Sequence, residues 1–136
     1  MSNKTFQGDL GVATAVLHYT RLGLGVSIPT TEHSRYDLIV DDNGHLSRVQ
    51  VKTCGVKTAA GTYEVQLRTN GANYSTKNKH TKISSEECDA VFILTGDGCA
   101  YEFFSKTLEG KSTITLGRNY QDQKVGDYPP IVSFWT

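Results

Sequence analysis

The sequence predicts a single α/β domain, residues 1–136, built on a mixed β-sheet, and three observations support this prediction. The length of 136 residues is enough for one hydrophobic core. Residues 8 to 23 space their apolar side chains as an amphipathic helix does, whereas the next apolar runs are short, as strands are. Residues 90 to 94 form a continuous apolar run, which is typical of a central strand covered on both faces.

The helix predicted over residues 8 to 23 has one buried stripe. Asp9 is expected at its start, where the helix dipole favours a carboxylate, and Gly23 is suited to end it. The apolar residues of the predicted stripe are Leu10, Ala13, Val16, Leu17 and Leu22. A short strand is expected over residues 26 to 28, where Pro29 ends its pairing.

Residues 36 to 40 and 46 to 51 are two apolar runs joined by Asp42-Asn43-Gly44, and this arrangement predicts a β-hairpin. Asn and Gly both tolerate the positive φ that a tight hairpin turn requires. If Asn43 and Gly44 are the two loop residues, the numbers of paired residues sum to 87. A four-residue loop over residues 42 to 45 keeps the same sum, so the register is the same in both cases.

This register predicts which side chains share a face of the hairpin. Asp37 falls opposite Gln50, with Lys52 as its diagonal neighbour, at Cβ separations of about 5 Å and about 7 to 8 Å. The opposite face is predicted to enter the core and consists of Leu38, Val40, Val49 and Val51. The three polar groups together suit the binding of a metal ion and a phosphate. The alternative is that they are ordinary polar residues on a solvated face.

The second half of the chain adds further strands. Residues 62 to 69 alternate, with Tyr63, Val65 and Leu67 on one face. Residues 70 to 82 are rich in Asn, Thr, Lys and Gly and predict a loop. Ser84 or Ser85 is suited to cap a single helical turn before the strand at residues 90 to 94.

A second hairpin is predicted beyond that strand. Gly96-Asp97-Gly98 turns the chain into a strand over residues 99 to 104, and residues 112 to 116 form a further strand. The apolar tail over residues 131 to 135 is expected to pack onto the body of the domain.

Charge is distributed unevenly along a chain whose formal net charge is zero. Residues 48 to 82 carry seven basic groups and one acidic group, which gives plus 6. Residues 1 to 47 carry minus 2 and residues 83 to 136 carry minus 4. A basic middle with acidic flanks suits a polyanionic partner bound by one surface, and a solvated basic loop is the alternative.

Several function classes lack their sequence signals. No Gly-rich phosphate loop is present, so a nucleotide-binding Rossmann or P-loop fold is not expected. The four histidines have no metal-site spacing, and the serines have no hydrolase motif. The three cysteines are expected to be reduced thiols in a cytoplasmic protein. No apolar run is long enough to span a membrane, and no signal-peptide pattern is found.

Phosphodiester hydrolysis is the chemistry that the polar face of the hairpin suits. The reaction needs charge stabilisation on the phosphate oxygens, an activated water and help for the leaving oxygen, and a divalent metal supplies much of each. Asp37 is a natural Mg²⁺ ligand, and the carbonyl of Gln50 or a neighbouring backbone carbonyl can complete the shell. Lys52 would add positive charge at the phosphorus or orient the attacking water.

Residues 34 to 37, Ser-Arg-Tyr-Asp, and residues 48 to 53, Arg-Val-Gln-Val-Lys-Thr, resemble the active-site core of the PD-(D/E)XK nucleases. They are most similar to the branch associated with group I introns, the homing endonucleases of cyanobacterial type, whose second acid is commonly Gln. The similarity extends to about residue 118. It implies a restriction-endonuclease-like fold, in which helices flank a mixed β-sheet core.

The resemblance also implies roles for individual residues. Asp37 and Gln50 would bind a catalytic Mg²⁺, with Mn²⁺ as a substitute, and Lys52 would assist the water and the phosphate. The first-helix carboxylate of the family has Val12 in its place here. Asp9 is the carboxylate on that helix and is the candidate to take over this catalytic and metal-binding role.

The function implied is a Mg²⁺-dependent, sequence-specific double-stranded DNA endonuclease, a homing enzyme in the cytoplasm of a prokaryote or encoded by a phage. The loop over residues 70 to 82 would enter a groove. A dimer or tetramer is expected, because one such chain covers only a half-site. The residues expected to contact DNA are Arg35, Lys57, Arg68, Lys77, Lys79 and Lys82. The alternatives are a nuclease that resolves four-way junctions and a DNA-binding module that has lost catalysis.

Overall fold

Six strands form a mixed sheet in the order β1-β2-β3-β7-β8-β10. A computed structural model describes residues 3–70 and 80–131, with side chains described over residues 6–68 and 82–131. Only the β3–β7 pair of this sheet is parallel, among the residues so described. The strands of the sheet are β1 (Gly25–Ser27), β2 (Leu38–Asp42), β3 (His45–Cys54), β7 (Ala90–Thr95), β8 (Cys99–Phe104) and β10 (Lys124–Asp127).

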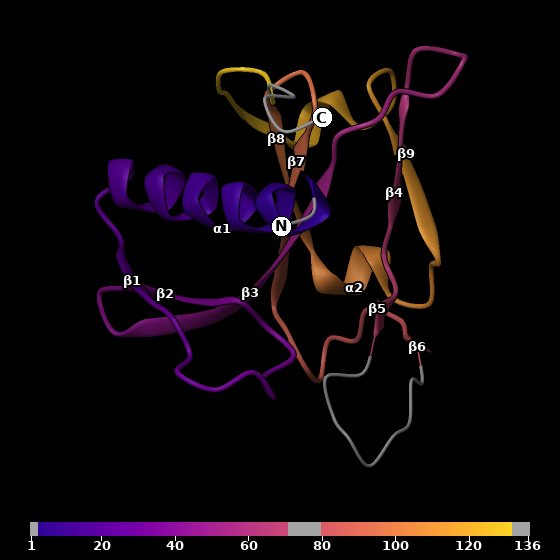
Figure 1. The fold of residues 1–136 in the computed structure, drawn as a ribbon. Coiled ribbons are helices and arrows are strands. Elements are labelled where there is room, and N and C mark those ends of the chain that lie inside the picture. The colour runs from indigo at the N-terminus through magenta and orange to yellow at the C-terminus, as the bar shows by residue number, and fades with distance from the viewer. Residues whose placement is uncertain (1–2, 71–79, 132–136) are drawn as a thin grey trace.

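Different elements cover the two faces of this sheet (Figure 1). Helix α1 (Asn3–Arg21) lies on one face. On the other lie α2 (Ser105–Leu108) and a two-stranded sheet made of β4 (Tyr63–Gln66) and β9 (Thr113–Leu116). The shorter elements are β5 (Thr69–Asn70), β6 (His80–Thr81) and the 3₁₀ turn η2 (Gln121–Gln123). The result is the predicted α/β architecture with a mixed sheet.

Strand β7 is buried on both faces, as its continuous apolar run predicted. Phe92 and Leu94 join the core beneath α1, whereas Val91 and Ile93 join the core beneath the β4–β9 sheet. Residues 91 to 95 are all buried. The strand therefore holds the two layers of the molecule together.

The first hairpin has the predicted turn and register. Pairs run from Leu38↔Val49 to Asp42↔His45, so each pair sums to 87. Asn43 and Gly44 adopt φ values of 52° and 93°, and the amide of Gly44 donates to Asp41 Oδ1 at 2.7 Å. The two-residue loop is the correct alternative, because both of its residues accept the positive φ of a tight turn.

The buried face of α1 differs from the predicted stripe. The helix begins at Asn3 rather than near Asp9. Of the predicted stripe, Val16 is partly buried against the core, whereas Leu10 is 41% exposed and Leu17 is 48% exposed. Ala13 is exposed as well, as is Leu22 beyond the helix end. The residues turned to the sheet are Gly11, Thr14, Ala15, His18 and Tyr19.

Close packing against β3 explains this rotation of the helix. A Cβ added at Gly11 would lie 2.3 Å from Cγ2 of Thr53, so the helix approaches β3 closely at this residue. The polar members of the buried face are satisfied internally: Thr14 donates to the Leu10 carbonyl at 2.7 Å, and His18 Nδ1 lies 2.9 Å from the Tyr128 hydroxyl. The hydroxyl of Tyr19 donates to Glu102. Small residues and hydrogen-bonded polar residues thus occupy the helix face that packs on the sheet, where the spacing of apolar residues predicted leucines.

The remaining predictions are largely confirmed. Tyr63, Val65 and Leu67 are buried and alternate with exposed residues. The segment after Ser84 forms a single turn, with the amide of Cys88 3.1 Å from the Ser84 carbonyl, and residues 99 to 104 pair with β7. Ile131 packs against the α1-side core, whereas residues 132 to 136 lie outside the described part.

The loop predicted over residues 70 to 82 is anchored by paired strand ends. Asn70 pairs with His80, and Thr69 with Thr81, so the two ends form the short β5–β6 ladder. Residues 71 to 79 between these ends lie outside the described residues. Within the ranges given above, no helix has the length and apolar character needed to cross a membrane.

Candidate active site

Asp37 stands directly before β2 and leaves the regular ladder of the hairpin. Its amide donates to the Val49 carbonyl at 2.8 Å, and its Oδ2 accepts the amide of Val51 at 2.7 Å. The carboxylate therefore takes a backbone hydrogen bond of β3. The first ladder pair is Leu38↔Val49, so Asp37 does not pair with Gln50 as predicted.

Lys52 projects from β3 on the face away from α1. Val51 and Thr53 contact Gly11 of the helix, so the alternation of the strand turns Gln50 and Lys52 to the other side. Lys52 Nζ donates to the carbonyl of Arg68 at 3.3 Å, which ties β3 to the end of the β4 segment. The predicted shared face of Gln50 and Lys52 is therefore present, and both residues are half-buried.

Burial shifts both charges of this site toward neutrality. Burial raises the pKa of Asp37, while the Val51 amide and the Lys52 charge act in the opposite direction. Burial lowers the pKa of Lys52, and the Asp37 charge opposes that shift. The two groups thus interact electrostatically while each is partly withdrawn from water. A cation that binds beside Asp37 would favour its ionised form.

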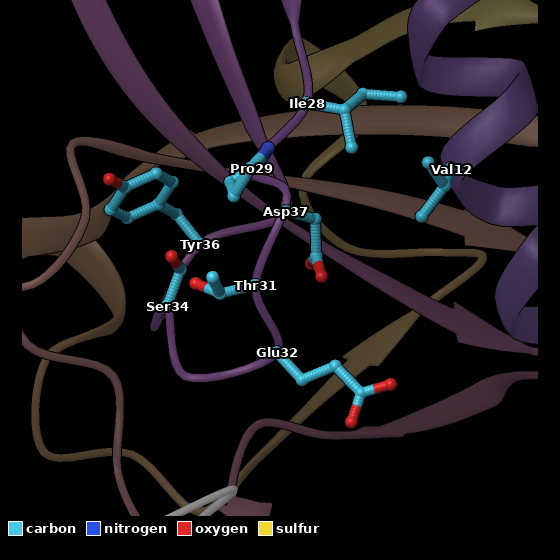
Figure 2. A pocket seen from close by; sticks show the side chains of 8 residues that line it. All are labelled: Val12, Ile28, Pro29, Thr31, Glu32, Ser34, Tyr36 and Asp37. Atoms are coloured by element: carbon cyan, nitrogen blue, oxygen red, sulfur yellow. The ribbon is translucent and has the colours of Figure 1, made fainter.

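A cavity of about 310 Å³ opens beside Asp37. Figure 2 shows the Asp37 carboxylate directed toward the segment that carries Glu32, with Val12 projecting from α1; all three residues line the cavity. Its lining consists of Val12, Ile28, Pro29, Thr31, Glu32, Ser34, Tyr36 and Asp37. Glu32 was not among the candidates drawn from the sequence. In the sequence, Glu32 is marked only by being an acidic residue in the polar segment that precedes Asp37.

Asp9 is exposed on α1 and does not line this cavity. Val12, three residues further along the helix, lines the cavity instead. Three residues rotate a helix by about 300°, so Asp9 points about 60° away from Val12 and lies about 4.5 Å from it along the axis. In the part of the chain that the structure describes, no group of three or more His, Cys, Asp or Glu side chains is arranged to hold a metal.

The basic residues that were expected to contact DNA have different surroundings. Arg35 forms an ion pair with Glu87, with Nε 3.1 Å from Oε2. Arg68 donates to the Ser112 hydroxyl at 3.1 Å, and Lys57 Nζ lies 5.9 Å from the ring centroid of Tyr63. Lys82 is exposed, whereas Lys77 and Lys79 lie outside the described residues.

Arg48 and Asp89 form a polar lock that the sequence did not reveal. The guanidinium of Arg48 donates to both carboxylate oxygens of Asp89 at 3.1 Å and to the Glu86 carbonyl at 2.7 Å. The Arg48 amide also donates to Asp89 Oδ2 at 2.7 Å. These bonds fasten the segment that precedes β7 to β3. The partners lie 41 residues apart, so no local pattern marks them.

Comparisons with known proteins place this geometry in a wider setting. A model of the family described as PD-(D/E)XK endonuclease matches residues 1–124. Among solved structures, that of a bacterial homing endonuclease, I-Ssp6803I, is similar with a TM-score of 0.74 and 24% sequence identity, covering 90% of this chain and 83% of that chain. At this identity the similarity shows the fold. Among curated protein sequences, none is significantly similar to this chain.

Proposed function

The chain belongs to the PD-(D/E)XK endonuclease family, and from this premise we propose that it is a divalent-metal-dependent, sequence-specific endonuclease that cuts double-stranded DNA. The observation that carries the proposal is the pair of half-buried, interacting opposite charges, Asp37 and Lys52, of which Asp37 also lines an open cavity between α1 and the β1–β2 connection. The homing endonuclease with the similar fold favours a homing role. We propose Mg²⁺ as the ion, with Mn²⁺ as a substitute.

The donors at this site suit a hard cation. Asp37 and Gln50 would hold the ion, because Mg²⁺ prefers carboxylate and carbonyl oxygens. The hydrogen bond from Val51 fixes one carboxylate oxygen of Asp37, and among the described residues no donor bonds to the other. A bound divalent ion would neutralise phosphate charge and lower the pKa of the attacking water.

Lys52 acts from the protein side of this reaction. Its ammonium carries three donor hydrogens, of which one is directed to the Arg68 carbonyl. The others are available to a phosphate oxygen or to the attacking water. Because partial burial weakens the competing hydration of this charge, its interaction with a developing charge on the phosphate is stronger than at an exposed site.

The DNA surface is proposed to run along the basic part of the chain. Arg35, Arg68 and Lys57 are held by internal contacts and would present their remaining donors to phosphates, and Lys82 is exposed beside the β5–β6 ladder. Lys77 and Lys79 complete the proposed set. We further propose that two or four chains act together, since cleavage of both strands needs a second active site, and that the enzyme works in the cytoplasm of a prokaryote.

A cleavage assay with matched variants tests this proposal. Genomic DNA and a synthetic four-way junction are each incubated with the protein and Mg²⁺, and cut ends are mapped, with EDTA as the negative control. Lys52→Met is expected to reduce cleavage by about a hundred- to a thousand-fold while leaving DNA affinity unchanged. Lys106→Met, a change of an exposed lysine on α2, is expected to cut normally.

The outcomes separate the proposed function from its rivals. Cleavage at defined sequences supports a sequence-specific endonuclease, whereas cutting of the junction without regard to sequence indicates a resolvase. A second candidate function is a DNA-binding module without catalysis, which the apolar Val12 in the cavity favours. For that candidate the parent protein would bind DNA, and neither Mg²⁺ nor Mn²⁺ would produce nicks.

A further inference from the structure

We infer that Glu32 is the second carboxylate of the metal site and shares a divalent cation with Asp37. The inference rests on the proposed function, because it assigns a ligand to the cation that this function needs. Nothing in the sequence motif or in the spacing of the hairpin includes Glu32. Its assignment comes from the cavity beside Asp37, which it lines.

The connection between β1 and β2 delivers Glu32 to this position. Strand β1 is followed by Ile28 and then by Pro29, whose ring fixes φ. The chain then passes around the cavity to Asp37. Both ends of the connection are held in the sheet, because β1 and β2 pair with each other. Figure 2 shows the Asp37 carboxylate directed toward the segment from which the Glu32 side chain extends, and both residues line the cavity.

Charge balance favours a second carboxylate at this site. Asp37 carries one negative charge, and the nearby Lys52 carries one positive charge, so these two groups together attract a divalent cation only weakly. Gln50 adds an oxygen donor without charge. Of the residues that line the cavity, only Asp37 and Glu32 carry a carboxylate. Glu32 therefore restores a net negative charge, which divalent-cation sites built from oxygen ligands use to gain affinity.

Glu32 is available for this role. It is exposed, and no described residue donates a hydrogen bond to it or forms an ion pair with it. By contrast, the carboxylate of Glu109 bonds to Ser85, and that of Glu87 pairs with Arg35. Asp9 is exposed outside the lining of the cavity.

The cavity is large enough for a hydrated ion and part of its substrate. A volume of about 310 Å³ corresponds to about ten waters at about 30 Å³ each. Mg²⁺ keeps several waters when it binds to one or two carboxylates, and substrate phosphate takes up further positions. A site shared by Asp37 and Glu32 thus leaves room for both waters and a phosphate oxygen.

Binding of Mn²⁺ alone to the full-length chain tests the inference independently of activity. Isothermal titration calorimetry and the electron paramagnetic resonance signal of free Mn²⁺ give the Kd for each variant. Glu32→Gln is expected to raise the Kd at least about tenfold, since perturbing a single metal-site group commonly has an effect of that size. A matched change of an exposed acid, Glu64→Gln, is expected to leave the Kd within about twofold of the parent.

A rescue variant makes the test sharper. Val12→Glu, introduced into the Glu32→Gln protein, places a carboxylate on another wall of the same cavity and is expected to recover most of the lost Mn²⁺ affinity. Thermal unfolding of each variant without metal serves as the folding control. Glu32 is exposed, so its amide variant is expected to melt with the parent.

The results distinguish the inference from the function on which it rests. If Asp37→Asn loses Mn²⁺ binding and Glu32→Gln does not, Glu32 is not a ligand, and the proposed function stands. If the parent protein binds no Mn²⁺, with or without DNA, both the inference and the metal-dependent function are overturned. Loss of Mn²⁺ affinity in Glu32→Gln, together with an unchanged melting temperature and an unchanged Kd for Glu64→Gln, would support the inference.

Discussion

Two aspartates flank β3 and accept the same kind of hydrogen bond from its backbone, yet their pKa values are shifted in opposite directions. Asp37 accepts the amide of Val51 on the β2 side, and Asp89 accepts the amide of Arg48 on the β7 side, each at 2.7 Å. The hydrogen bonds with Arg48 hold the pKa of Asp89 below its usual value. Burial raises the pKa of Asp37 above its usual value.

The counter-charge explains the difference. Asp89 faces a guanidinium that binds both of its oxygens, so its negative charge is neutralised within the protein. Among the described residues, the charge that attracts Asp37 is that of the partly buried Lys52, and burial outweighs that attraction. The negative charge of Asp89 is thus balanced within the protein, whereas a bound cation would stabilise the ionised form of Asp37 the most. This contrast separates a fold-stabilising acid from a candidate metal ligand.

The largest effect on stability is expected at the contact between Arg48 and Asp89. Asp89→Asn removes the charge-assisted bonds to Arg48 and is predicted to lower the free energy of unfolding by about 1 kcal/mol. This value is already reduced for solvent screening, because the side chains of Arg48 and Asp89 are 34% and 43% exposed. Urea unfolding at pH 7 in EDTA measures it. An effect below about 0.3 kcal/mol would mean that the Arg48–Asp89 lock does not stabilise the fold.

The same substitution at Asp37 is expected to have a smaller effect of opposite sign. Asp37→Asn keeps an oxygen for the Val51 amide but removes a charge that burial disfavours. The free energy of unfolding in EDTA should therefore stay level or rise by up to about 0.5 kcal/mol. Destabilisation as large as that of Asp89→Asn would show that Asp37 is a structural acid like its counterpart.

The pH dependence of these two variants sharpens the comparison. The folded-state pKa of Asp89 lies below its usual value of 3.8, so its stabilisation is present above that value and is lost as pH falls through the folded-state pKa. The folded-state pKa of Asp37 lies above 3.8, so its contribution is present below that value and is lost as pH rises through the folded-state pKa.

Stability curves between pH 3 and pH 7 test these signs. The deficit of Asp89→Asn relative to the parent should shrink toward acid pH. The small gain of Asp37→Asn should appear only as pH rises, because both proteins carry a neutral side chain at low pH. Parallel curves for the two variants would contradict the assigned directions.

Local chemistry made the hairpin predictable in detail. Asn43 and Gly44 fix the turn, and the turn fixes a register in which one face is apolar. The shared face of Gln50 and Lys52 follows from the alternation of the strand. Asp37 departs from the ladder because its own carboxylate competes for the Val51 amide, and no sequence period encodes that competition.

Features that depend on distant packing were not predictable from the sequence. The approach of Gly11 to Thr53 decides which face of α1 is buried, and this contact joins residues 42 positions apart. The Arg48–Asp89 lock and the delivery of Glu32 to the cavity likewise depend on how the chain returns upon itself. Apolar spacing reports which residues alternate or recur, but it does not report close approach or counter-charges.

The central claim is that Asp37 is a partly desolvated carboxylate to which a divalent cation would bind. NMR titration of its ¹³C-labelled carboxyl group tests this claim most directly. Without metal, the pKa of Asp37 should lie above 3.8 and that of Asp89 below 3.8. Added Mg²⁺ should lower the pKa of Asp37 and leave that of Asp89 unchanged, because a bound cation favours the ionised form. An Asp37 pKa at or below 3.8 in EDTA, or one that Mg²⁺ does not move, would contradict the account.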